Sequence, residues 1–369
     1  MPGRTIGLDT RMIQHSGIGT YLRGLLEGFE KAGPPPGSEI YLYGGRSKRD
    51  SAANFKMRKF RSPIYSLQEQ LEYPGRIREC DLWHAPHYNI PVLKGKTRLV
   101  VTVHDLIHWI FRKDFFSPLQ TLYAKVMLEK AVSAADHIIT VSEKTKEDLI
   151  GYFKAGPGKI SVIYEAVSET FKPVTDPQMI RSVKRKYGLP EKFFLYVGMI
   201  KPHKNILWLV RLFSKLEQFS RVQSRLVIAG KADPKHAREF KTLSRLSPEG
   251  GILHIPFVET DDLPALYSGA TALVHPSLYE GFGLTLLEAM ACGTPVIAFR
   301  TSSIPEVTGD AAVLVPAGSE QAMEEALIRM ETDSGRREYF RGLGLARVRE
   351  FSWEKTAHQT KTVYEKVLG

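Results

Sequence analysis

Residues 275–298 read HPSLYEGFGLTLLEAMACGTPVIA, and this stretch decides the fold class of the 369-residue chain. An apolar, β-prone segment precedes it at Thr271–Val274, and another closes it at Pro295–Phe299. Between them lie a glycine turn and a short apolar helical pattern, so the order is strand, loop, helix and strand, which is one unit of a parallel sheet. Ligands of such sheets bind beyond the carboxyl ends of the strands, which makes the loop around Glu280 the expected ligand-binding loop.

Two carboxylates in this unit, Glu280 and Glu288, are separated by seven residues. Glu288 has the apolar helical neighbours Leu284, Ala291 and Cys292, so we expect it on the helix face that points inward. An unpaired buried carboxylate is costly; such a residue reaches solvent, pairs with an arginine, or accepts hydrogen bonds from ligand hydroxyls. Glu280 precedes the helix, where a carboxylate either caps the helix or belongs to a site.

The pattern from Glu280 through Glu288, followed by residues 289–298, resembles the EX7E signature of retaining GT-B glycosyltransferases, and more narrowly glycosyltransferase family 4. The resemblance spans nearly the whole chain, because other family-like pieces follow in order. These pieces are SGIGTY at 16–21, TVHDL at 102–106, TVS at 140–142, Val197-Gly198 with Lys204-Asn205, and SSIPEV at 302–307. It implies an α/β protein of the GT-B fold, in which two Rossmann-like domains with parallel sheets face each other across a cleft.

The domain organisation follows from strand and helix patterns that alternate twice along the chain. A proline-containing stretch without periodicity, Phe171–Pro177, separates the two series and indicates a linker. We therefore expect an N-terminal, acceptor-side domain at 1–172 and a nucleotide-sugar-binding domain at 173–348. The amphipathic tail at 349–369 is expected to form a helix, and the resemblance implies that this helix packs back on the N-terminal domain.

The resemblance places the nucleotide-sugar donor mostly on the C-terminal domain. Glu288 would bind the ribose hydroxyls, and Glu280 with the backbone of the glycine turn would hold the sugar hydroxyls. Lys204 would stabilise the departing diphosphate, although its spacing alone favours a solvated surface lysine. The donor-binding residues implied in this way are Gly17, Gly19, Gly198, Lys204, Val258, Leu263, Glu280, Gly281, Phe282, Gly283, Leu284 and Glu288.

The phosphate-binding positions depart from the family pattern in one respect. The family often has an arginine after the glycine or before the lysine, where this chain has Met199 and His203. The second diphosphate cation therefore stays open between His203, Lys201 and an arginine elsewhere. A dehydrogenase is disfavoured, because Leu22 stands where a dinucleotide fingerprint beginning at Gly17 needs a third glycine.

Histidines concentrate in the N-terminal half. A histidine after a strand is often structural, but the resemblance implies that His104 contacts a hydroxyl of the donor sugar. Asp105 would orient His104 or hold its loop. His104, Glu280 and Lys204 are thus the expected catalytic residues, and His84, His87, Tyr88 and Asp105 are expected on the acceptor side. We expect no metal, since the histidine spacing fits no zinc pattern and no Asp-x-Asp motif is present.

The expected reaction is metal-independent sugar transfer with retention. No nucleophile is evident, so we expect front-face transfer in which the leaving phosphate takes the acceptor proton. The motif style resembles bacterial mannosyltransferases of polysaccharide assembly, which favours GDP-mannose as donor and a saccharide or lipid-linked saccharide as acceptor. A UDP-sugar transferase of the same fold, using glucose or GlcNAc, and a nucleotide-sugar epimerase are the alternatives.

The net charge of +11 is partly concentrated at Arg46–Arg61, where seven basic residues face one acid. This run is either a solvated loop or an attachment to an anionic membrane surface. Nucleic-acid binding is not expected, because no recognition motif accompanies the charge. No stretch reaches the roughly 18 apolar residues of a membrane span, no secretory pattern opens the chain, and Cys80 and Cys292 form no disulfide framework. We expect a cytoplasmic protein, peripheral at the inner membrane face.

Overall fold

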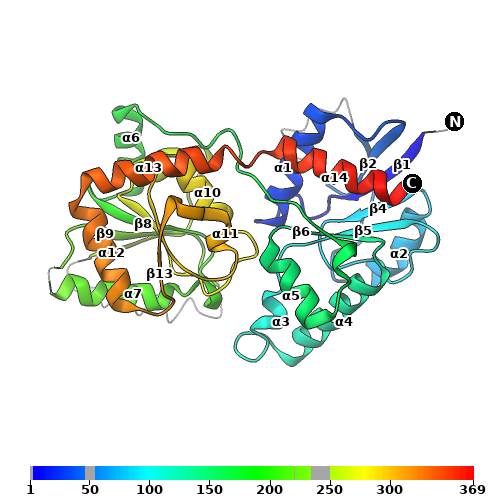
Figure 1. Cartoon of the computed structure of the whole chain (residues 1–369), viewed down its shortest axis with the longest axis horizontal. Coiled ribbons are helices and arrows are strands. Elements are labelled where there is room, and N and C mark those ends of the chain that lie inside the picture. The colour runs from blue at the N-terminus through cyan, green and yellow to red at the C-terminus, as the bar shows by residue number, and fades with distance from the viewer. Residues whose placement is uncertain (1–2, 46–54, 220, 234–249) are drawn as a thin grey trace. The chain divides into compact units, whose positions relative to one another are not determined.

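A computed structural model describes residues 3–45, 55–219, 221–233 and 250–369 of the chain. The chain forms two compact units, one made of Met1–Ala166 with Phe351–Gly369 and the other of Val167–Glu350. We call them unit 1 and unit 2. Each contains a parallel sheet with helices on both of its faces (Figure 1). The expected architecture of two Rossmann-like domains is confirmed.

Unit 1 has a seven-stranded sheet in the order β3-β2-β1-β4-β5-β6-β7, with every pair parallel. The chain order reverses between β1 and β4, so the loops after these strands leave the same edge of the sheet in opposite directions. The strands are β1 (Arg4–Asp9), β2 (Ser38–Tyr43), β3 (Phe55–Arg58), β4 (Leu82–Ala85), β5 (Arg98–Val103), β6 (His137–Thr140) and β7 (Ile160–Val162). The helices are α1 (Ile18–Ala32), α2 (Leu67–Ile77), α3 (Ile107–Ile110), α4 (Pro118–Ala134), α5 (Glu143–Phe153) and α14 (Trp353–Leu368).

Local sequence signals start several of these helices. Ser142 caps α5, as expected, because its hydroxyl accepts a hydrogen bond from the backbone N–H of Thr145 at 3.0 Å. Ser117 and Gln120 form a capping box at the start of α4, with Pro118 in its first turn. These caps satisfy backbone donors that would otherwise lack a partner at the helix ends.

The C-terminal helix α14 packs along α1, which confirms the expected return of the tail to the N-terminal domain. Two glycines of α1 make this contact possible. A Cβ atom at Gly24 would lie 2.0 Å from the Trp353 ring, and one at Gly28 would lie 2.1 Å from the Trp353 carbonyl oxygen. The hydroxyl of Thr356 also donates to the carbonyl oxygen of Tyr164 at 2.7 Å, which anchors α14 beyond the end of β7.

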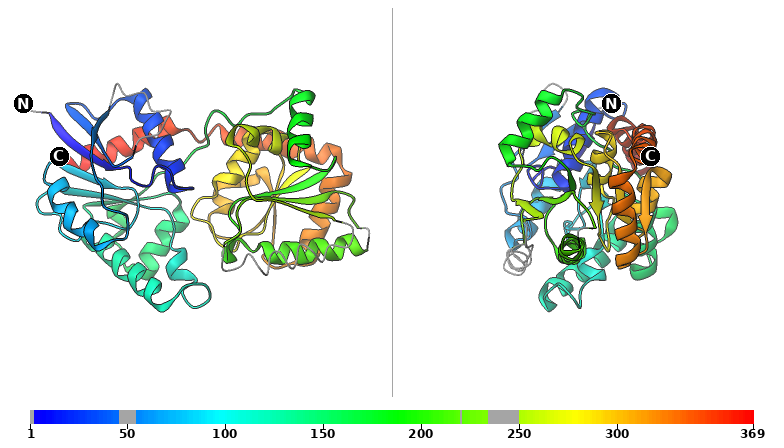
Figure 2. Two further views of the ribbon diagram at one scale, coloured as in Figure 1. Left: turned by 180° about the vertical axis from the view of Figure 1, so that it is seen from behind. Right: turned by 90° about the vertical axis from the view of Figure 1, so that its left-hand side faces the viewer.

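Unit 2 has a six-stranded parallel sheet in the order β10-β9-β8-β11-β12-β13 (Figure 2). Here the order reverses between the neighbours β8 and β11. The strands are β8 (Phe193–Val197), β9 (Arg225–Ala229), β10 (Ile252–Ile255), β11 (Ala272–His275), β12 (Val296–Phe299) and β13 (Ala312–Val315). The helices are α6 (Pro177–Tyr187), α7 (Ile206–Gln218), α9 (Leu263–Ser268), α10 (Leu284–Ala291), α11 (Ile304–Thr308), α12 (Glu320–Thr332) and α13 (Ser334–Val348).

The basic run Arg46–Arg61 is not a loop throughout. Residues 46–54 lie outside the described residues, but Phe55–Arg58 form the edge strand β3 beside β2. Lys56 pairs with Glu39 at 2.8 Å, and Arg58 lies 3.8 Å from Glu79. Charged side chains of this kind are typical of edge strands, where they discourage pairing with other chains. The alternating strand and helix pattern also predicts a helix at 234–246, and these residues lie outside the described ranges.

Candidate active site

Lys204 and Glu280 meet at the carboxyl edge of the unit 2 sheet, because the adjacent strands β8 and β11 lead into their loops. The Lys204 Nζ atom lies 2.6 Å from both carboxylate oxygens of Glu280. The last residue of β11, His275, places its Nε2 atom 2.7 Å from Glu280 Oε1. Glu280 is only 5% exposed, so two fixed polar partners surround a buried carboxylate at the topological switch point of the sheet.

The electrostatics of Glu280 follow from these partners. Burial alone would raise the pKa of the Glu280 carboxyl, but the positive charge of Lys204 and the hydrogen bond from His275 hold that pKa well below its usual range. Glu280 is therefore a carboxylate at neutral pH, and it can accept further hydrogen bonds. Within the described residues, the buried His275 Nδ1 atom has no hydrogen-bond partner, so the Nε2 atom makes the contact of this ring with Glu280.

The glycine turn after Glu280 is fixed by the loop after β12. Gly283 has a φ of 101°, in the left-handed region, and a Cβ atom there would lie 2.8 Å from Leu286 Cδ1. The hydroxyl of Ser303 donates to the carbonyl oxygens of Glu280 and Phe282 at 3.0 and 3.1 Å. The turn leads directly into α10, whose first backbone N–H groups have no acceptor within the helix and suit an oxygen-rich ligand.

Glu288, on α10, is half-buried, and its partner is a tyrosine rather than an arginine. The hydroxyl of Tyr267, on α9, donates to Glu288 Oε2 at 2.7 Å. Burial raises the pKa of Glu288 to about 6, although the Tyr267 hydrogen bond acts in the opposite direction. The pKa values of the two carboxyls are thus shifted in opposite directions, upward for Glu288 and downward for Glu280.

The remaining donor-side positions frame the same edge of unit 2. Gly198 follows β8 with a φ of 142°, and a Cβ atom at Gly230 would lie only 2.0 Å from the Gly198 carbonyl oxygen. Val258 and Leu263 are half-buried in the segment after β10. His203 is buried, and its backbone carbonyl accepts a hydrogen bond from Leu278 at 2.8 Å.

In unit 1, His104 follows β5, and its two ring nitrogens contact partners within that unit. Its Nε2 atom lies 2.9 Å from the carbonyl oxygen of Pro86, which can only accept, so Nε2 carries a proton. Its Nδ1 atom lies 2.9 Å from Glu165 Oε1, and Glu165 is buried just beyond β7. Glu165, which the sequence pattern does not single out, orients His104. Asp105 instead accepts the Ile107 backbone N–H at 3.0 Å and holds the start of α3.

The expected acceptor-side residues differ in accessibility. His84 is fully buried, and its ring nitrogens lie 2.6 Å from the Tyr364 hydroxyl and 2.8 Å from the Thr102 hydroxyl. Burial, followed by the charge of His104, lowers the pKa of His84 to about 3. It joins β4 to α14, so we leave it out of the proposed site. His87 is half-buried and stacks on Tyr88 with 3.9 Å between ring centroids.

The loop after β1 holds the two expected phosphate-side glycines. Gly17 has a φ of 73° and precedes α1, and a Cβ atom there would meet no atom of the described residues within 4 Å. A Cβ atom at Gly19 would lie 2.6 Å from the Ile13 carbonyl oxygen, so Gly19 permits close packing of α1 on its own loop. The structure therefore requires glycine at the two positions for different reasons. Gly17 adopts a left-handed backbone conformation, and at Gly19 there is no space for a side chain.

A buried polar network near this edge of unit 1 has no counterpart in the sequence motifs. Arg11 is sandwiched between Asp9 and Glu69 and also donates to the Tyr73 hydroxyl at 2.7 Å. The Asn89 side chain donates to both oxygens of Glu69 at 2.9 Å. The network ties β1, α2 and the loop after β4 together, and satisfied networks of this kind rigidify a site.

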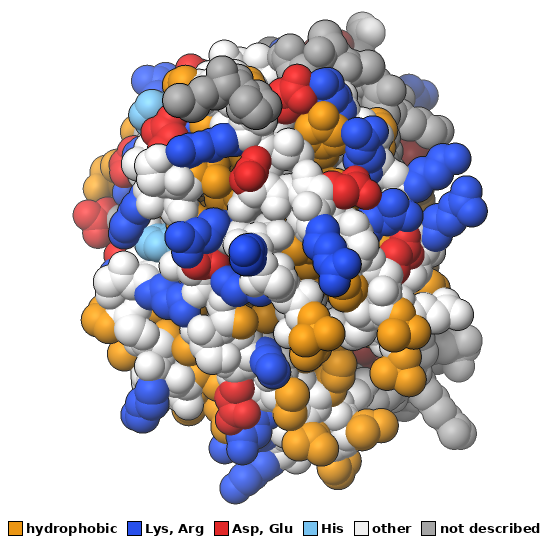
Figure 3. All heavy atoms as spheres, turned by 90° about the vertical axis from the view of Figure 1, so that its right-hand side faces the viewer, with side chains coloured by type: hydrophobic (Ala, Val, Ile, Leu, Met, Phe, Trp, Pro, Cys, Tyr) orange, Lys and Arg blue, Asp and Glu red, His pale blue; other side chains and the backbone are white. Residues whose placement is uncertain are grey.

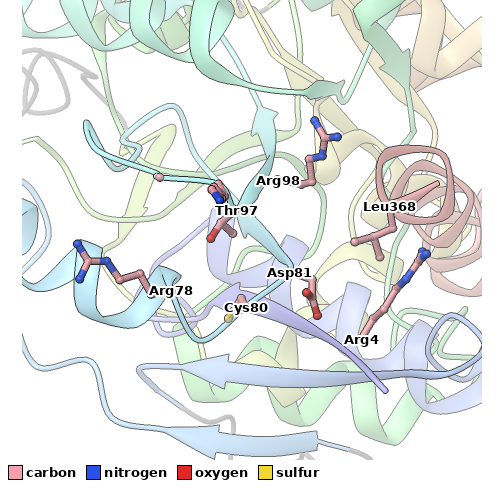
Figure 4. Close-up of a pocket in the computed structure, with 9 residues that line it drawn as sticks. Arg4, Arg78, Cys80, Asp81, Thr97, Arg98 and Leu368 are labelled. Carbon is pink, nitrogen blue, oxygen red and sulfur yellow. The ribbon is translucent and has the colours of Figure 1, made fainter. Parts of the chain in front are cut away.

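The pocket in Figure 4 is not part of this candidate site. Its lining includes Arg4, Asp81 and Arg98. Arg4 and Arg98 begin β1 and β5, and Asp81 directly precedes β4, so the pocket opens at the amino ends of the strands. That edge is opposite the one that carries His104. Within the described residues, no group of three or more His, Cys, Asp or Glu side chains is arranged to hold a metal ion.

The family models and the related proteins that match this chain are all glycosyltransferases. The model of "Glycosyl transferases group 1" matches residues 180–343, and that of "Glycosyltransferase Family 4" matches residues 15–171. The chain is 32% identical over 313 residues to the O-antigen chain mannosyltransferase B of Escherichia coli, covering 83% of this chain and 81% of that protein. An O-antigen chain mannosyltransferase of Salmonella typhimurium is 29% identical, covering 73% and 70%.

The solved structures share the fold at lower sequence identity. The Anabaena protein HepE, in complex with UDP and glucose, superposes with a TM-score of 0.78 at 18% identity, covering 98% of this chain and 100% of that chain. At this level of sequence identity, the superposition shows that the whole chain shares the fold. The family is shown by the relatives of higher sequence identity.

Proposed function

This chain belongs to the family 4 glycosyltransferases, and on that premise we propose that it transfers mannose from GDP-mannose to a saccharide or lipid-linked saccharide. Its family makes it a hexosyltransferase that retains anomeric configuration. The relatives that are O-antigen mannosyltransferases support the choice of mannose. The observation that carries the assignment to a site is the ion pair of Lys204 with the buried Glu280, beside His275 at the β8/β11 switch point.

In the proposed mechanism, Glu280 and the turn at 281–284 hold the sugar hydroxyls, Glu288 holds the ribose hydroxyls, and Lys204 neutralises charge on the diphosphate. The bond from the sugar C1 to the phosphate oxygen breaks as the acceptor oxygen bonds to C1 on the same face. The acceptor proton moves to the leaving phosphate oxygen, so no enzyme nucleophile is needed. A preorganised cation at Lys204 stabilises the charge that develops on the phosphate.

A UDP-sugar is the second candidate donor. It is favoured by one observation, the fold match to a structure that holds UDP and glucose. The polar groups of Val258 and Leu263 that could read a base are those of the backbone, and these two side chains offer no hydrogen bond that separates guanine from uracil.

The test is a thermal-shift titration of the full chain with GDP, UDP and ADP, followed by GDP-mannose and UDP-glucose. We expect GDP and GDP-mannose to raise the melting temperature selectively, since a ligand that binds only the folded state stabilises it. Selective stabilisation by UDP and UDP-glucose would replace the proposed donor with the second candidate. No shift with any of the five would contradict a donor site in unit 2.

The acceptor is proposed to lie at the cytoplasmic face of a membrane, with Arg46–Arg61 as one contact to anionic lipid. None of the helices in the described ranges is both long and apolar enough to cross a membrane.

Donor binding should weaken at acid pH because of Glu288. With its pKa raised to about 6 in the free protein, the carboxylate that accepts from the ribose is lost as pH falls, and about a tenth remains at pH 5. We expect the Kd for GDP-mannose to rise about tenfold between pH 8 and pH 5. The Glu288→Gln variant should bind more weakly at pH 8 and show a flat profile, measured by calorimetry.

Two features sharpen this measurement. GDP-mannose lacks the terminal phosphate that itself titrates near pH 6, and Glu280 keeps its charge because its pKa lies well below the usual range. The control is Glu338→Gln, an exposed position on α13, which should keep the wild-type profile. A pH dependence that survives in Glu288→Gln would remove Glu288 from the ribose site.

Glu165 is proposed to act as a positioning residue for His104. Replacing Glu165 with Gln removes the carboxylate opposite Nδ1, and loss of an orienting partner typically costs about 10- to 100-fold in activity. We expect kcat to fall about tenfold with an unchanged KM for the donor. Steady-state rates compared with Glu147→Gln, an exposed carboxylate on α5, measure the effect, and equal rates for the two variants would assign Glu165 a purely structural role.

A further inference from the structure

Helix α4 is apolar on two faces. One face is buried through Ala124, Met127, Leu128 and Ala131. The other exposes Leu119, Leu122, Tyr123 and Val126, whose exposed fractions run from 38% to 77%. Spacings of three and four residues place these four side chains on one side of the helix. A helix at the surface of a soluble protein normally carries polar residues there, so the outer face of α4 needs an explanation.

The apolar area continues beyond α4. Leu67 and Leu71 of α2 are 87% and 82% exposed, and Val92 and Leu93 in the loop after β4 are 43% and 69% exposed. We define the α2–α4 surface as Leu67, Leu71, Val92, Leu93, Leu119 and Leu122. Within the described ranges, every largely exposed leucine or valine lies at 67–126.

Hydrogen bonds and ring contacts join these three segments into one surface. The backbone N–H of Val92 donates to the Gln70 side chain at 2.9 Å, which fixes the loop on α2. The Tyr123 hydroxyl donates to Asn89 Oδ1 at 2.5 Å, which fixes α4 on the same loop. The Tyr65 and Tyr123 rings lie 6.0 Å apart between α2 and α4. These contacts fix the positions of α2, α4 and the loop that carry the apolar side chains.

The segment of chain that carries this area is rich in lysine and arginine. Residues 56–130 contain thirteen Lys and Arg against seven Asp and Glu, which is a net +6 of the +11 of the whole chain. Lys96 follows Leu93, and Lys125 and Lys130 continue α4, all exposed. Figure 3, which views the side of the molecule that carries α2, shows hydrophobic side chains gathered among lysines and arginines. An apolar patch in a basic surround is the pattern of a face that lies on an anionic bilayer.

We propose that the α2–α4 surface docks unit 1 on an anionic lipid bilayer, with its leucines entering the boundary between headgroups and acyl chains. The proposal rests on the proposed function only in that the acceptor is membrane-borne. A second copy of this chain is a poorer occupant, because a two-fold contact would bring two basic surrounds together, and like charges across an interface are unfavourable.

The experiment uses the full chain and vesicles of phosphatidylcholine with and without anionic phosphatidylglycerol, because basic segments are attracted to anionic headgroups. Co-sedimentation should show binding to the anionic vesicles and much weaker binding to pure phosphatidylcholine. The Leu119→Gln/Leu122→Gln variant should bind about 10- to 100-fold more weakly, because two apolar side chains that leave water on binding are replaced by polar ones. Met179→Gln/Phe219→Gln, which removes two exposed apolar side chains from unit 2, should bind as the wild type does.

Three further outcomes of these measurements would support or overturn the proposed surface. Equal vesicle binding by the leucine variant and the wild type would overturn the surface. A dimer in sedimentation velocity that dissociates in the leucine variant would make it an interface between copies and would also overturn it. Binding to vesicles without any response to GDP-mannose in the thermal shift would support the surface and contradict the proposed donor, so the two proposals fail separately.

Discussion

Replacing Glu280 with Gln lowers kcat for sugar transfer by about 10³-fold at saturating donor, while the folded structure is retained. The amide has nearly the same shape but cannot neutralise Lys204, whose Nζ atom lies 2.6 Å from both carboxylate oxygens. Removing one preorganised charged group from a water-excluded site costs about 10²- to 10³-fold in rate. Here the loss lies at the upper end, because Lys204 and His275 are left without their common partner.

Turnover of a radiolabelled donor measures this effect, with circular dichroism to verify folding. Glu338→Gln is the matched control, since it removes an exposed carboxylate from the same unit, and its rate should equal that of the wild type. A Glu280→Gln enzyme that folds and turns over within threefold of the wild type would remove Glu280 from the reaction.

Replacing Gly24 with Ala destabilises unit 1 by about 2–3 kcal/mol, although alanine ordinarily stabilises a helix by about 1 kcal/mol relative to glycine. The added Cβ atom would lie 2.0 Å from the Trp353 ring, so α14 must move away from α1. The fall in the melting temperature should be roughly 5–10 °C for a unit of this size. Thermal unfolding followed by tryptophan fluorescence reports the change.

Gly151 provides the matched control for this steric argument. It also lies within a helix, α5 of the same unit, but among the residues that the structure describes a Cβ atom there would have no neighbour within 4 Å. Gly151→Ala should therefore leave stability unchanged or raise it slightly. Trp353→Leu should relieve part of the loss in Gly24→Ala. Equal melting temperatures for the two glycine variants would contradict the close contact of α1 and α14.

Local sequence patterns were enough to predict the elements whose structure depends on neighbouring residues. The strands around the EX7E segment, the serine cap at Ser142 and the helical tail could all be predicted, because each depends on residues close in sequence. The neighbourhood of Lys204 and Glu280 was implied by the family resemblance, and the fold brings them together across 76 residues.

Partners that are distant in sequence could not be predicted in this way. His275 comes directly after the predicted strand Thr271–Val274, and Glu165 stands just past a strand that ends at Val162, where no motif marks it. His84 reads as a site residue, but its partner Tyr364 lies 280 residues away on α14. Only tertiary packing creates these contacts.

Tertiary packing also overrides local propensity in two elements. Helix α2 contains Pro74, which disfavours a helix, yet it forms because Tyr73 and Ile77 are buried against the sheet. The strand β3 lies in a run of basic residues, and pairing with β2 decides its conformation. A charge pattern alone predicts a solvated loop at such a position.

The most direct test of the proposed reaction is transfer from GDP-α-mannose to a saccharide acceptor by the purified chain, with the product linkage read by NMR. The proposal predicts a single new α-mannosidic linkage, formed only with the GDP donor and lost in Glu280→Gln. A β-linked product would contradict retention. Transfer of glucose from UDP-glucose, with none of mannose, would contradict the proposed donor.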